Sequence, residues 1–558
     1  METKHRFFYN ALLLTAVTLV MRTVAVSFNV YVSNQTGAET MGLIALIGGV
    51  YGFAVTLATS GIQLATVRTV AALPQGNNNR ALRRAVGACL GYAAFFGTLA
   101  SVLLFVFASP IGKGLLRDAR TVRALRVLAL TLLPIALGSV LNGYFTAVRR
   151  AWKNAVIQVS EQAIKISLTT YFLLSIAPKT VEGAMLAVLS GGAVAESASL
   201  LLNWILYCLD RRRLGQESQE KDAVFTGKKS GVAAIALPVA ISAYMRSGLL
   251  AIEHILIPHG LLKRGIETSA ALAAYGALQS MALPILLYPA AILTSFSALL
   301  IPEMTEQQTI GNRREIRYIA GRVYQMTLLF SIGVSGVIFF LSGELGVVLY
   351  HSETVSSFLR RLAPLIVIMY LDTATDGMLK GLGEQVYSMN VNIIDALLSV
   401  VAVALLVPHM GIDGYLVTIY ITEIFNAVCS ITRLLRITGY RPKLLRLLVL
   451  PLFSAIGATT LANLLFSFVF RGFGTALTLT LHISFTVALY LMLLTVSGAV
   501  DGRDADWLLS SLCIKRKKGE KVVVKKEKRR KKQSKMQNES TASSTCKHKN
   551  DAFYYKSI

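Results

Sequence analysis

Fourteen stretches of the chain, spread between Ala11 and Val496, are each long and apolar enough to cross a bilayer. A hydrocarbon core about 30 Å thick needs about 20 apolar residues of helix. The approximate bounds are 11–32, 41–72, 85–108, 122–147, 155–174, 183–208, 231–257, 270–301, 322–350, 357–380, 388–407, 414–437, 447–470 and 474–496. Because the period-2 alternation of a barrel is missing, the segments must be helices. The sequence therefore predicts an all-α polytopic membrane protein with about 14 transmembrane helices.

The composition agrees with this class and offers little to an enzyme. Hydrophobic residues make up 54% of the chain and charged residues only 15%, and a soluble chain with so few charges would aggregate. The five cysteines lack the spacing of a disulfide framework or a metal site. Neither a GxxxxGK[ST] phosphate loop nor an HExxH motif is present. The first apolar run is too long for a cleavable signal peptide. We therefore expect no enzyme activity, no metal and no cofactor.

The net charge is +26, and its distribution predicts the orientation of the chain. Basic clusters fall in about every second loop, namely at Lys4/Arg6, Arg80–Arg84, Arg149–Lys153, Arg211–Arg213, Arg313–Arg317 and Arg433–Lys443. Since basic loops stay on the cytoplasmic side, an even number of helices places both termini in the cytoplasm. The loops at Lys113–Arg123 and Lys263/Arg264 are basic exceptions on the opposite side.

The C-terminal tail is strongly basic. Between Lys515 and Lys535 it carries 13 Lys and Arg residues against two Glu. Beside a membrane helix, such a run favours the anionic inner leaflet as its partner. Nucleic acid is the weaker alternative, because no aromatic residues interrupt the basic core.

Paired markers indicate an internal duplication. They are Arg22 and Arg246 (224 apart), Glu39-Thr40 and Glu267-Thr268 (228), Asn142-Gly143 and Asp376-Gly377 (234), and Glu182-Gly183 and Asp413-Gly414 (231). A repeated six-helix unit preserves orientation and relates the two copies by an axis along the membrane normal. We expect two pseudo-symmetric six-helix lobes over 1–222 and 223–440, a helix pair over 441–500, and a disordered cytoplasmic tail over 501–558. The break between the lobes would fall in Asp210–Ser230.

Charged residues within the apolar segments are the candidate functional residues. A charge at bilayer depth costs at least about 2.5–3.5 kcal/mol, so it persists mainly where it faces water, a partner or substrate. Arg22 and Arg246 could both point into a central cavity and bind a diphosphate, since arginine binds phosphate oxygens bidentately. Alternatively, each arginine pairs with a buried carboxylate, such as Glu253 near Arg246, and only holds helices together.

The other candidates are Glu161, Lys165, Glu196, Glu253, Asp372, Asp376, Asp395 and Glu423, as ion-coupling or cavity charges. Glu161 and Lys165 are one turn apart, which favours a structural ion pair. Asp372 and Asp376 are also one turn apart, and their repulsion favours a bound proton or cation. Lys380, a further turn along, could neutralise part of that charge.

The stretch from Tyr275 through Pro284, Tyr288-Pro289 and Leu293-Thr294 to Leu299–Glu306 resembles the eighth-helix signature of a known family. The same family has counterparts of Leu141–Phe145 followed by Gln158 and Glu161, and of Leu379–Gly383. It is the stage V sporulation protein B and polysaccharide-flippase branch of the multidrug/oligosaccharidyl-lipid/polysaccharide exporter superfamily. The resemblance, over about residues 1–500, implies 14 helices, alternating access, and movement of a polyprenyl-diphosphate-linked saccharide to the outer leaflet.

Lipid II flippases, which are related to this branch, hold the diphosphate with cavity arginines. Arg22 matches the first-helix arginine of that pattern, Arg246 matches only loosely, and Phe28-Asn29 replaces a further arginine–aspartate pair. The resemblance also implies a groove for the polyprenyl tail beside the last two helices.

Three functions therefore stand as hypotheses. The first is a flippase for a lipid-linked cell-envelope precursor in the bacterial cytoplasmic membrane. The second is a proton- or sodium-coupled exporter of drugs or metabolites, which would depend on Asp372, Asp376 or Asp395. The third is a scaffold that recruits envelope enzymes through the basic tail.

Overall fold

The computed structural model describes residues 2–72, 79–148, 150–176, 180–216, 232–440, 445–469 and 476–500. These residues form helices joined by short turns, and no strand occurs among them. Met1–Tyr490 forms one compact unit, and the second unit, Leu491–Ile558, begins within the last helix. The predicted all-α class is confirmed.

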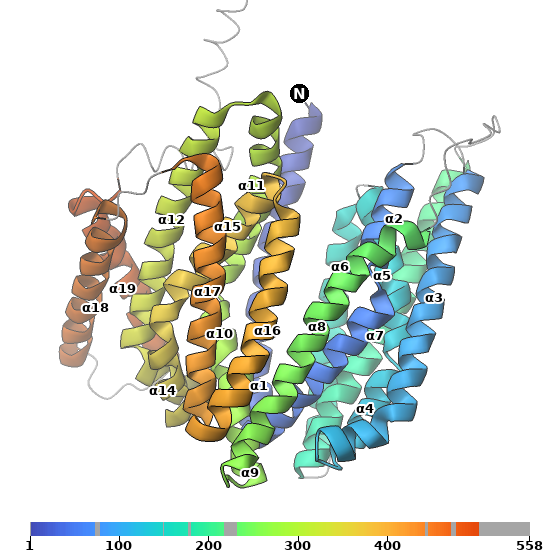
Figure 1. Ribbon diagram of the computed structural model, residues 1–558, viewed down its shortest axis with the longest axis horizontal. Coiled ribbons are helices and arrows are strands. Elements are labelled where there is room, and N and C mark those ends of the chain that lie inside the picture. Colours follow the sequence, from blue (N-terminus) through green and yellow to red (C-terminus); the bar gives the residue numbers. More distant parts are fainter. Residues whose placement is uncertain are drawn as a thin grey trace, which may run out of the picture. The chain divides into compact units, whose positions relative to one another are not determined.

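The first half of the chain contains α1 (Glu2–Thr59), α2 (Ile62–Ala71), α3 (Asn79–Ser109), η1 (Pro110–Leu115), α4 (Thr121–Ala129), α5 (Leu132–Ala147), α6 (Ala151–Tyr171), η2 (Phe172–Ile176) and α7 (Val181–Gln216). Apolar residues favour these long helices, and proline occurs in them only in the first turn of α5 (Pro134) and at the start of η1 (Pro110), where it is tolerated. Within this half, α3 runs beside α5 and α6 beside α7 (Figure 1).

The second half contains α8 (Val232–Lys263), α9 (Thr268–Gly276), η3 (Ala277–Ala282), α10 (Leu283–Leu287), α11 (Ala290–Ile310), α12 (Arg313–Phe340), α13 (Ser342–Tyr350), α14 (Glu353–Leu362), η4 (Ala363–Leu365), α15 (Ile366–Gly381), α16 (Gln385–Met410), α17 (Ile412–Thr438), η5 (Leu445–Val449), α18 (Leu450–Val469) and α19 (Ala476–Val496). Here α16 lies between α8 and α17, and α15 lies beside α11 (Figure 1).

Twelve stretches of the described residues are long and apolar enough to cross a membrane. They cover thirteen of the fourteen predicted segments, because Val17–Ala71 contains the first two. The remaining segment, 155–174, falls on α6 and η2, where polar residues such as Glu161 and Lys165 lower the mean hydropathy. The predicted number of about 14 is therefore compatible with the structure.

Gly37 interrupts α1. Its φ of 81° and ψ of 168° lie in a region that glycine tolerates and other residues avoid. Before this kink, Asn29 donates a hydrogen bond of 2.6 Å to the carbonyl oxygen of Ser280 in η3. After it, the hydroxyl oxygen of Tyr51 lies 2.6 Å from that of Thr131, the residue directly before α5. The two parts of α1 thus have hydrogen-bond partners in different halves of the sequence.

Close backbone contact joins the second part of α1 to α9. A Cβ added to Gly42 would clash with the backbone of Leu272, and one added to Gly276 would clash with that of Ala38. Only glycine allows the two helices to approach this closely. The two glycines, 234 residues apart, therefore fix where these helices cross.

Ion pairs join the end of α7 and the end of α17 to the turns that precede α6 and α16. Asp210 accepts hydrogen bonds from Arg150 and Lys153, and the Asp210 and Lys153 side chains are only 2% and 8% exposed. Arg433 forms a 2.9 Å ion pair with Glu384, and these side chains are 34% and 26% exposed. The first clamp is therefore buried and the second partly solvated.

The helices α18 and α19 pack onto α12. The Tyr490 ring lies against Gly333, and its hydroxyl donates a 2.8 Å hydrogen bond to the Leu329 carbonyl oxygen. Gly336 faces Ala455 of α18 in the same way. The predicted terminal helix pair thus packs against α12 at two glycines, Gly333 and Gly336.

The division into lobes at residues 222 and 440 stays a prediction, because Met1–Tyr490 behaves as one compact unit. The predicted break at Asp210–Ser230 lies outside the described residues from position 217 onward, and so does the predicted tail at 501–558.

Candidate functional site

A cavity of about 490 Å³ lies among α8, α10, α11, α15, α16 and α17. We call it the C-terminal cavity. Its polar lining residues are Ser242, Arg246, Tyr370, Asp372, Thr373, Asp376, Lys380, Ser388, Asn392, Glu423, Asn426 and Ser430. This cavity therefore brings together four of the predicted site residues, namely Arg246, Asp372, Asp376 and Glu423. The first and the last of them are 177 residues apart in the sequence.

The two predicted arginines differ in position. Arg246 lies in the cavity wall within electrostatic reach of Asp395. Arg22 has an exposed side chain on the first part of α1 and is not among the residues that line this cavity. Within the described part of the chain, neither arginine has a carboxylate at ion-pair distance. The alternative that Arg246 is held in a direct pair with Glu253 therefore finds no contact to support it.

The acidic pair of α15 is partly neutralised, as predicted. Lys380 Nζ lies 2.5 Å from Asp376 Oδ2, and the Ser388 hydroxyl donates a hydrogen bond to the other oxygen of Asp376. Asp372, in contrast, lies toward Ser430, and its Oδ1 is buried without a hydrogen-bond partner. Both oxygens of Asp376 thus have partners, whereas Oδ1 of Asp372 has no hydrogen-bond donor.

Three further predicted carboxylates surround the same region. Glu423 lines the cavity and interacts electrostatically with Asp372 and Asp395. Asp395 Oδ1 is buried without a hydrogen-bond partner. Glu253 is only 8% exposed and lies toward Ser399 and Asp395. Because like charges repel in a medium of low dielectric constant, this arrangement favours uptake of a proton or another cation.

The remaining predicted charges form a separate group, the N-terminal cluster, defined as Tyr51, Glu161, Lys165, Glu196 and Ser199. Glu196 of α7 interacts electrostatically with Glu161 and Lys165 of α6, and with Tyr51 of α1. The expected ion pair between Glu161 and Lys165 is wrong, since none joins them in the described structure. The Ser199 hydroxyl donates a 2.7 Å hydrogen bond to Glu161 Oε2 instead. In the part of the chain that the structure describes, Lys165 forms no ion pair with Glu196 either.

Several polar residues of the C-terminal cavity escaped the sequence prediction. Ser388 and Asn392 are four residues apart on α16, and Asn426 and Ser430 follow the predicted Glu423 at intervals of three and four on α17. This helical spacing of uncharged polar residues inside apolar segments was the available signal. A search restricted to ionisable residues could not use it.

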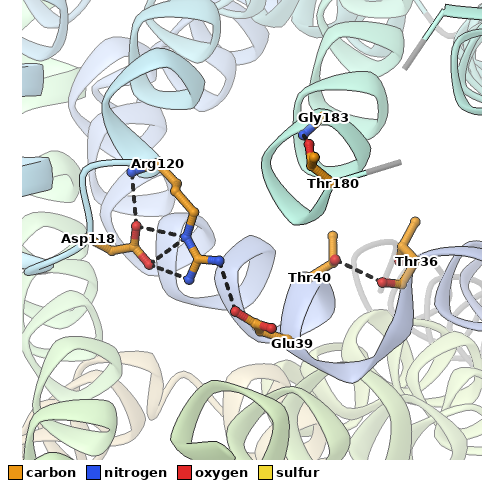
Figure 2. A network of polar contacts seen from close by, with 7 residues as sticks. All are labelled: Thr36, Glu39, Thr40, Asp118, Arg120, Thr180 and Gly183. Atoms are coloured by element: carbon orange, nitrogen blue, oxygen red, sulfur yellow. Dashed lines mark hydrogen bonds and ion pairs between the residues drawn. The ribbon is translucent and has the colours of Figure 1, made fainter. Parts of the chain in front are cut away.

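A network of charges lies beside the kink of α1 (Figure 2). Arg120, just before α4, forms ion pairs with Asp118 at 2.7 Å and with Glu39 at 2.8 Å. The hydrogen bonds that the Arg120 guanidinium donates to Asp118, followed by the one that it donates to Glu39, raise its pKa well above the usual range. Arg123 similarly lies 3.3 Å from Glu182. Much of the basic charge predicted to break the orientation rule at Lys113–Arg123 is therefore neutralised locally.

Within the described residues, no three His, Cys, Asp or Glu side chains lie close enough together to hold a metal ion. The chemistry of the two sites is therefore that of carboxylates, a lysine in each, one cavity arginine and hydroxyl groups. Such groups can bind charged solutes and exchange protons.

Comparison with known proteins agrees with this description. Stage V sporulation protein B of Bacillus subtilis (strain 168) is 26% identical over 419 residues, which cover 74% of this chain and 80% of that protein. Lipid II flippase MurJ of the same organism is 24% identical over 467 residues, covering 77% and 83%.

The fold is also that of a solved transporter. A structure of lipid II flippase MurJ in an inward closed conformation aligns with a TM-score of 0.61 over 87% of this chain and 98% of that chain, at 10% identity. The model of the polysaccharide biosynthesis protein family matches residues 7–306, more than half of the chain. The resemblance predicted from the eighth-helix signature is confirmed. The chain therefore belongs to the polysaccharide biosynthesis protein family, as a multi-pass membrane protein of the transporter and flippase type.

Proposed function

We propose that the protein is a flippase that moves a polyprenyl-diphosphate-linked saccharide across the bacterial cytoplasmic membrane by alternating access. The substrate would be a peptidoglycan precursor or a polysaccharide unit. Arg246 and Arg22 would bind the diphosphate, and the saccharide would pass through the water-filled space between two lobes, 1–222 and 223–440. Both termini would lie in the cytoplasm, with the basic tail against the anionic inner leaflet.

The observation that carries this proposal is the state of Arg246. Its guanidinium lies in a cavity wall at bilayer depth, near Asp395 but without an ion pair to any described carboxylate. A permanently charged group in that position needs an anionic partner. A diphosphate has the charge and the paired oxygens that a guanidinium fork binds.

The carboxylates would supply the energy coupling. Asp372, Asp395 and Glu423 interact electrostatically, and the first two each have a buried oxygen without a donor. Proton binding removes the repulsion between these carboxylates and the negative charge on a buried oxygen that has no donor. We propose that these residues exchange protons with solution during the cycle.

The test is flipping of a fluorescent polyprenyl-diphosphate saccharide by the full-length protein in proteoliposomes. Wild type is compared with Arg22→Ala and Arg246→Ala, and Arg123→Ala serves as a control because its side chain is 75% exposed. We expect activity in wild type and in the control, and loss of activity in Arg22→Ala and Arg246→Ala while the thermal stability of both variants is unchanged. Wild-type protein that binds and moves no lipid-linked saccharide would refute the proposal.

A second candidate function is a proton- or sodium-coupled exporter of organic cations. It is favoured by one observation, namely that carboxylates outnumber the cations around the C-terminal cavity. Uptake of ethidium driven by an imposed proton or sodium gradient, and lost in Asp372→Asn, would establish this function in place of the first.

A further inference from the structure

A contact near the turn between α16 and α17 shows which residues of these antiparallel helices lie at the same level. A Cβ added to Gly414 would lie 2.6 Å from the carbonyl oxygen of Leu406. Asn426 is twelve residues further along α17, and position 394 is twelve residues back along α16. Since both helices rise by about 1.5 Å per residue, Asn426 lies within one turn of the level of Asn392. Both asparagines line the C-terminal cavity.

The opposite ends of the two helices give the same alignment. There Glu384, directly before α16, forms a 2.9 Å ion pair with Arg433 of α17. Seven residues inward from these partners are Val391 and Asn426. The side-chain amides of Asn392 and Asn426 are therefore level with each other on neighbouring helices.

Arg246 reaches the same level from a third helix. The helices α8 and α16 run side by side in the same direction (Figure 1), and a Cβ added to Gly260 would lie 2.8 Å from Val407 Cγ1. Arg246 and Ile393 each lie fourteen residues before this contact, and both line the cavity. One guanidinium and two amides thus lie at one level of the C-terminal cavity.

The two amides have hydrogen-bonding groups to spare. Within the residues that the structure describes, Asn426 forms no hydrogen bond. Asn392 donates a 2.7 Å hydrogen bond from Nδ2 to the Ser388 carbonyl oxygen, which leaves its Oδ1 and one N–H. Both side chains are half-buried. Water satisfies such groups until a ligand that can replace its hydrogen bonds displaces it.

The chemistry at this level favours a hydroxyl-rich group next to an anion. A sugar hydroxyl both donates and accepts hydrogen bonds, and so does a side-chain amide. The guanidinium of Arg246 binds phosphate oxygens, and a sugar attached to that phosphate would extend to the amides. A polyprenyl chain has no polar atom to offer them, and an organic cation would pair with the carboxylates and leave the amides to water.

We propose that Asn392 and Asn426 form a sugar subsite, which binds hydroxyl groups of the first saccharide residue while Arg246 binds the adjacent phosphate. This inference rests on the proposed function, because it takes the lipid-linked saccharide from it, and it assigns the part of the cavity that recognises the sugar. The two asparagines are specificity-determining residues, since they distinguish a phosphate that carries a sugar from one that does not.

The experiment measures the affinity of the purified full-length protein in nanodiscs for undecaprenyl diphosphate and for the same lipid carrying glucose, galactose or N-acetylglucosamine. Wild type should bind at least one sugar-bearing lipid about tenfold more tightly than the sugarless lipid. Asn392→Leu and Asn426→Leu keep a similar side-chain volume and remove the hydrogen bonds. Each should reduce the sugar preference to about twofold or less and leave binding of the sugarless lipid unchanged, which also shows that the variant is folded.

Two control variants separate sugar recognition from other effects. Asn390→Leu makes the same change at an exposed position of α16 that is not among the residues lining the cavity, and it should keep the wild-type sugar preference. Arg246→Ala should weaken binding of all the lipids alike, because the phosphate is common to them.

Equal affinity of wild type for all the lipids, or a sugar preference that survives in the folded leucine variants of Asn392 and Asn426, would overturn the sugar subsite and leave the proposed function standing. Wild type that binds none of the lipids refutes the proposed function, and the sugar subsite with it.

Discussion

The N-terminal cluster and the C-terminal cavity, whose predicted acids Glu161 and Asp395 are 234 residues apart, compensate their charge differently. In the N-terminal cluster two carboxylates, Glu161 and Glu196, share one lysine and one serine hydroxyl. Around the C-terminal cavity five carboxylates share Arg246 and Lys380, and two buried oxygens have no donor. The comparison teaches that a hydroxyl donor in the first site fills the acceptor of Glu161, whereas in the second site Asp372 and Asp395 each keep a buried oxygen without a donor.

The ion-pair clamps at the helix ends also differ between the two halves. In the first half the clamp around Asp210 is buried, and in the second half the Glu384–Arg433 clamp is partly solvated. Breaking the first clamp would therefore leave a buried charge without its partner, whereas water can solvate the residues of the second. The buried oxygens of Asp372 and Asp395 that have no hydrogen-bond donor suit a site that gains and loses a proton or a ligand.

The largest effect should come from Asp210→Ala. It leaves Lys153, which is 8% exposed, buried without its carboxylate, and breaking such a pair costs about 3–5 kcal/mol. Glu384→Ala at the solvated clamp should cost about 1 kcal/mol or less. Thermal unfolding of the purified variants in detergent checks the ranking. Equal losses would remove the distinction between the two clamps.

The next largest effect concerns transport. Asp372→Asn combined with Glu423→Gln should reduce the flipping rate about 100-fold, equivalent to about 2.7 kcal/mol, because the carboxylates around the C-terminal cavity lose their exchangeable proton. Glu161→Gln should reduce it about threefold or less, because its carboxylate already has a hydrogen-bond donor. Initial rates in proteoliposomes measure both. A greater loss in Glu161→Gln would place the coupling in the N-terminal cluster instead.

Arg246→Lys should have an intermediate effect, on the affinity of the C-terminal cavity for a diphosphate. Lysine keeps the charge but loses the planar fork, so binding of a diphosphate should weaken about tenfold, equivalent to about 1.4 kcal/mol. Binding of a polyprenyl-diphosphate saccharide to the purified protein gives the affinity. Full binding by the lysine variant would show that charge alone is needed, which an organic anion of any shape could satisfy.

The smallest effect should come from the network in Figure 2. Arg120→Ala removes ion pairs to Glu39 and Asp118 whose side chains are 26% and 9% exposed, at a cost of about 1 kcal/mol. Because the pKa of Arg120 is raised, its contribution is present at all pH values below the ordinary arginine pKa and is lost only above it. The stability difference should therefore stay constant between about pH 6 and pH 9. A difference that varies in this range would show that another group carries it.

The sequence by itself determined the class of the fold. Long apolar segments can satisfy their backbone in lipid only as helices, so the elements followed from composition and length. It also provided the short list of buried charges, because each is costly enough to stand out in an apolar segment. The eighth-helix signature then identified the family.

Only the tertiary structure decided which of those charges meet. Sequence spacing favoured an ion pair between Glu161 and Lys165, but the hydroxyl of Ser199 on a neighbouring helix takes the carboxylate. Likewise, Arg246 and Asp372 line one cavity through the packing of α8 against α16 and of α15 against α17, whereas Arg22 does not line it. Helical periodicity fixes the face on which a side chain lies, but its partner comes from another helix, and helix packing depends on many small contacts such as that of Gly42 with Leu272.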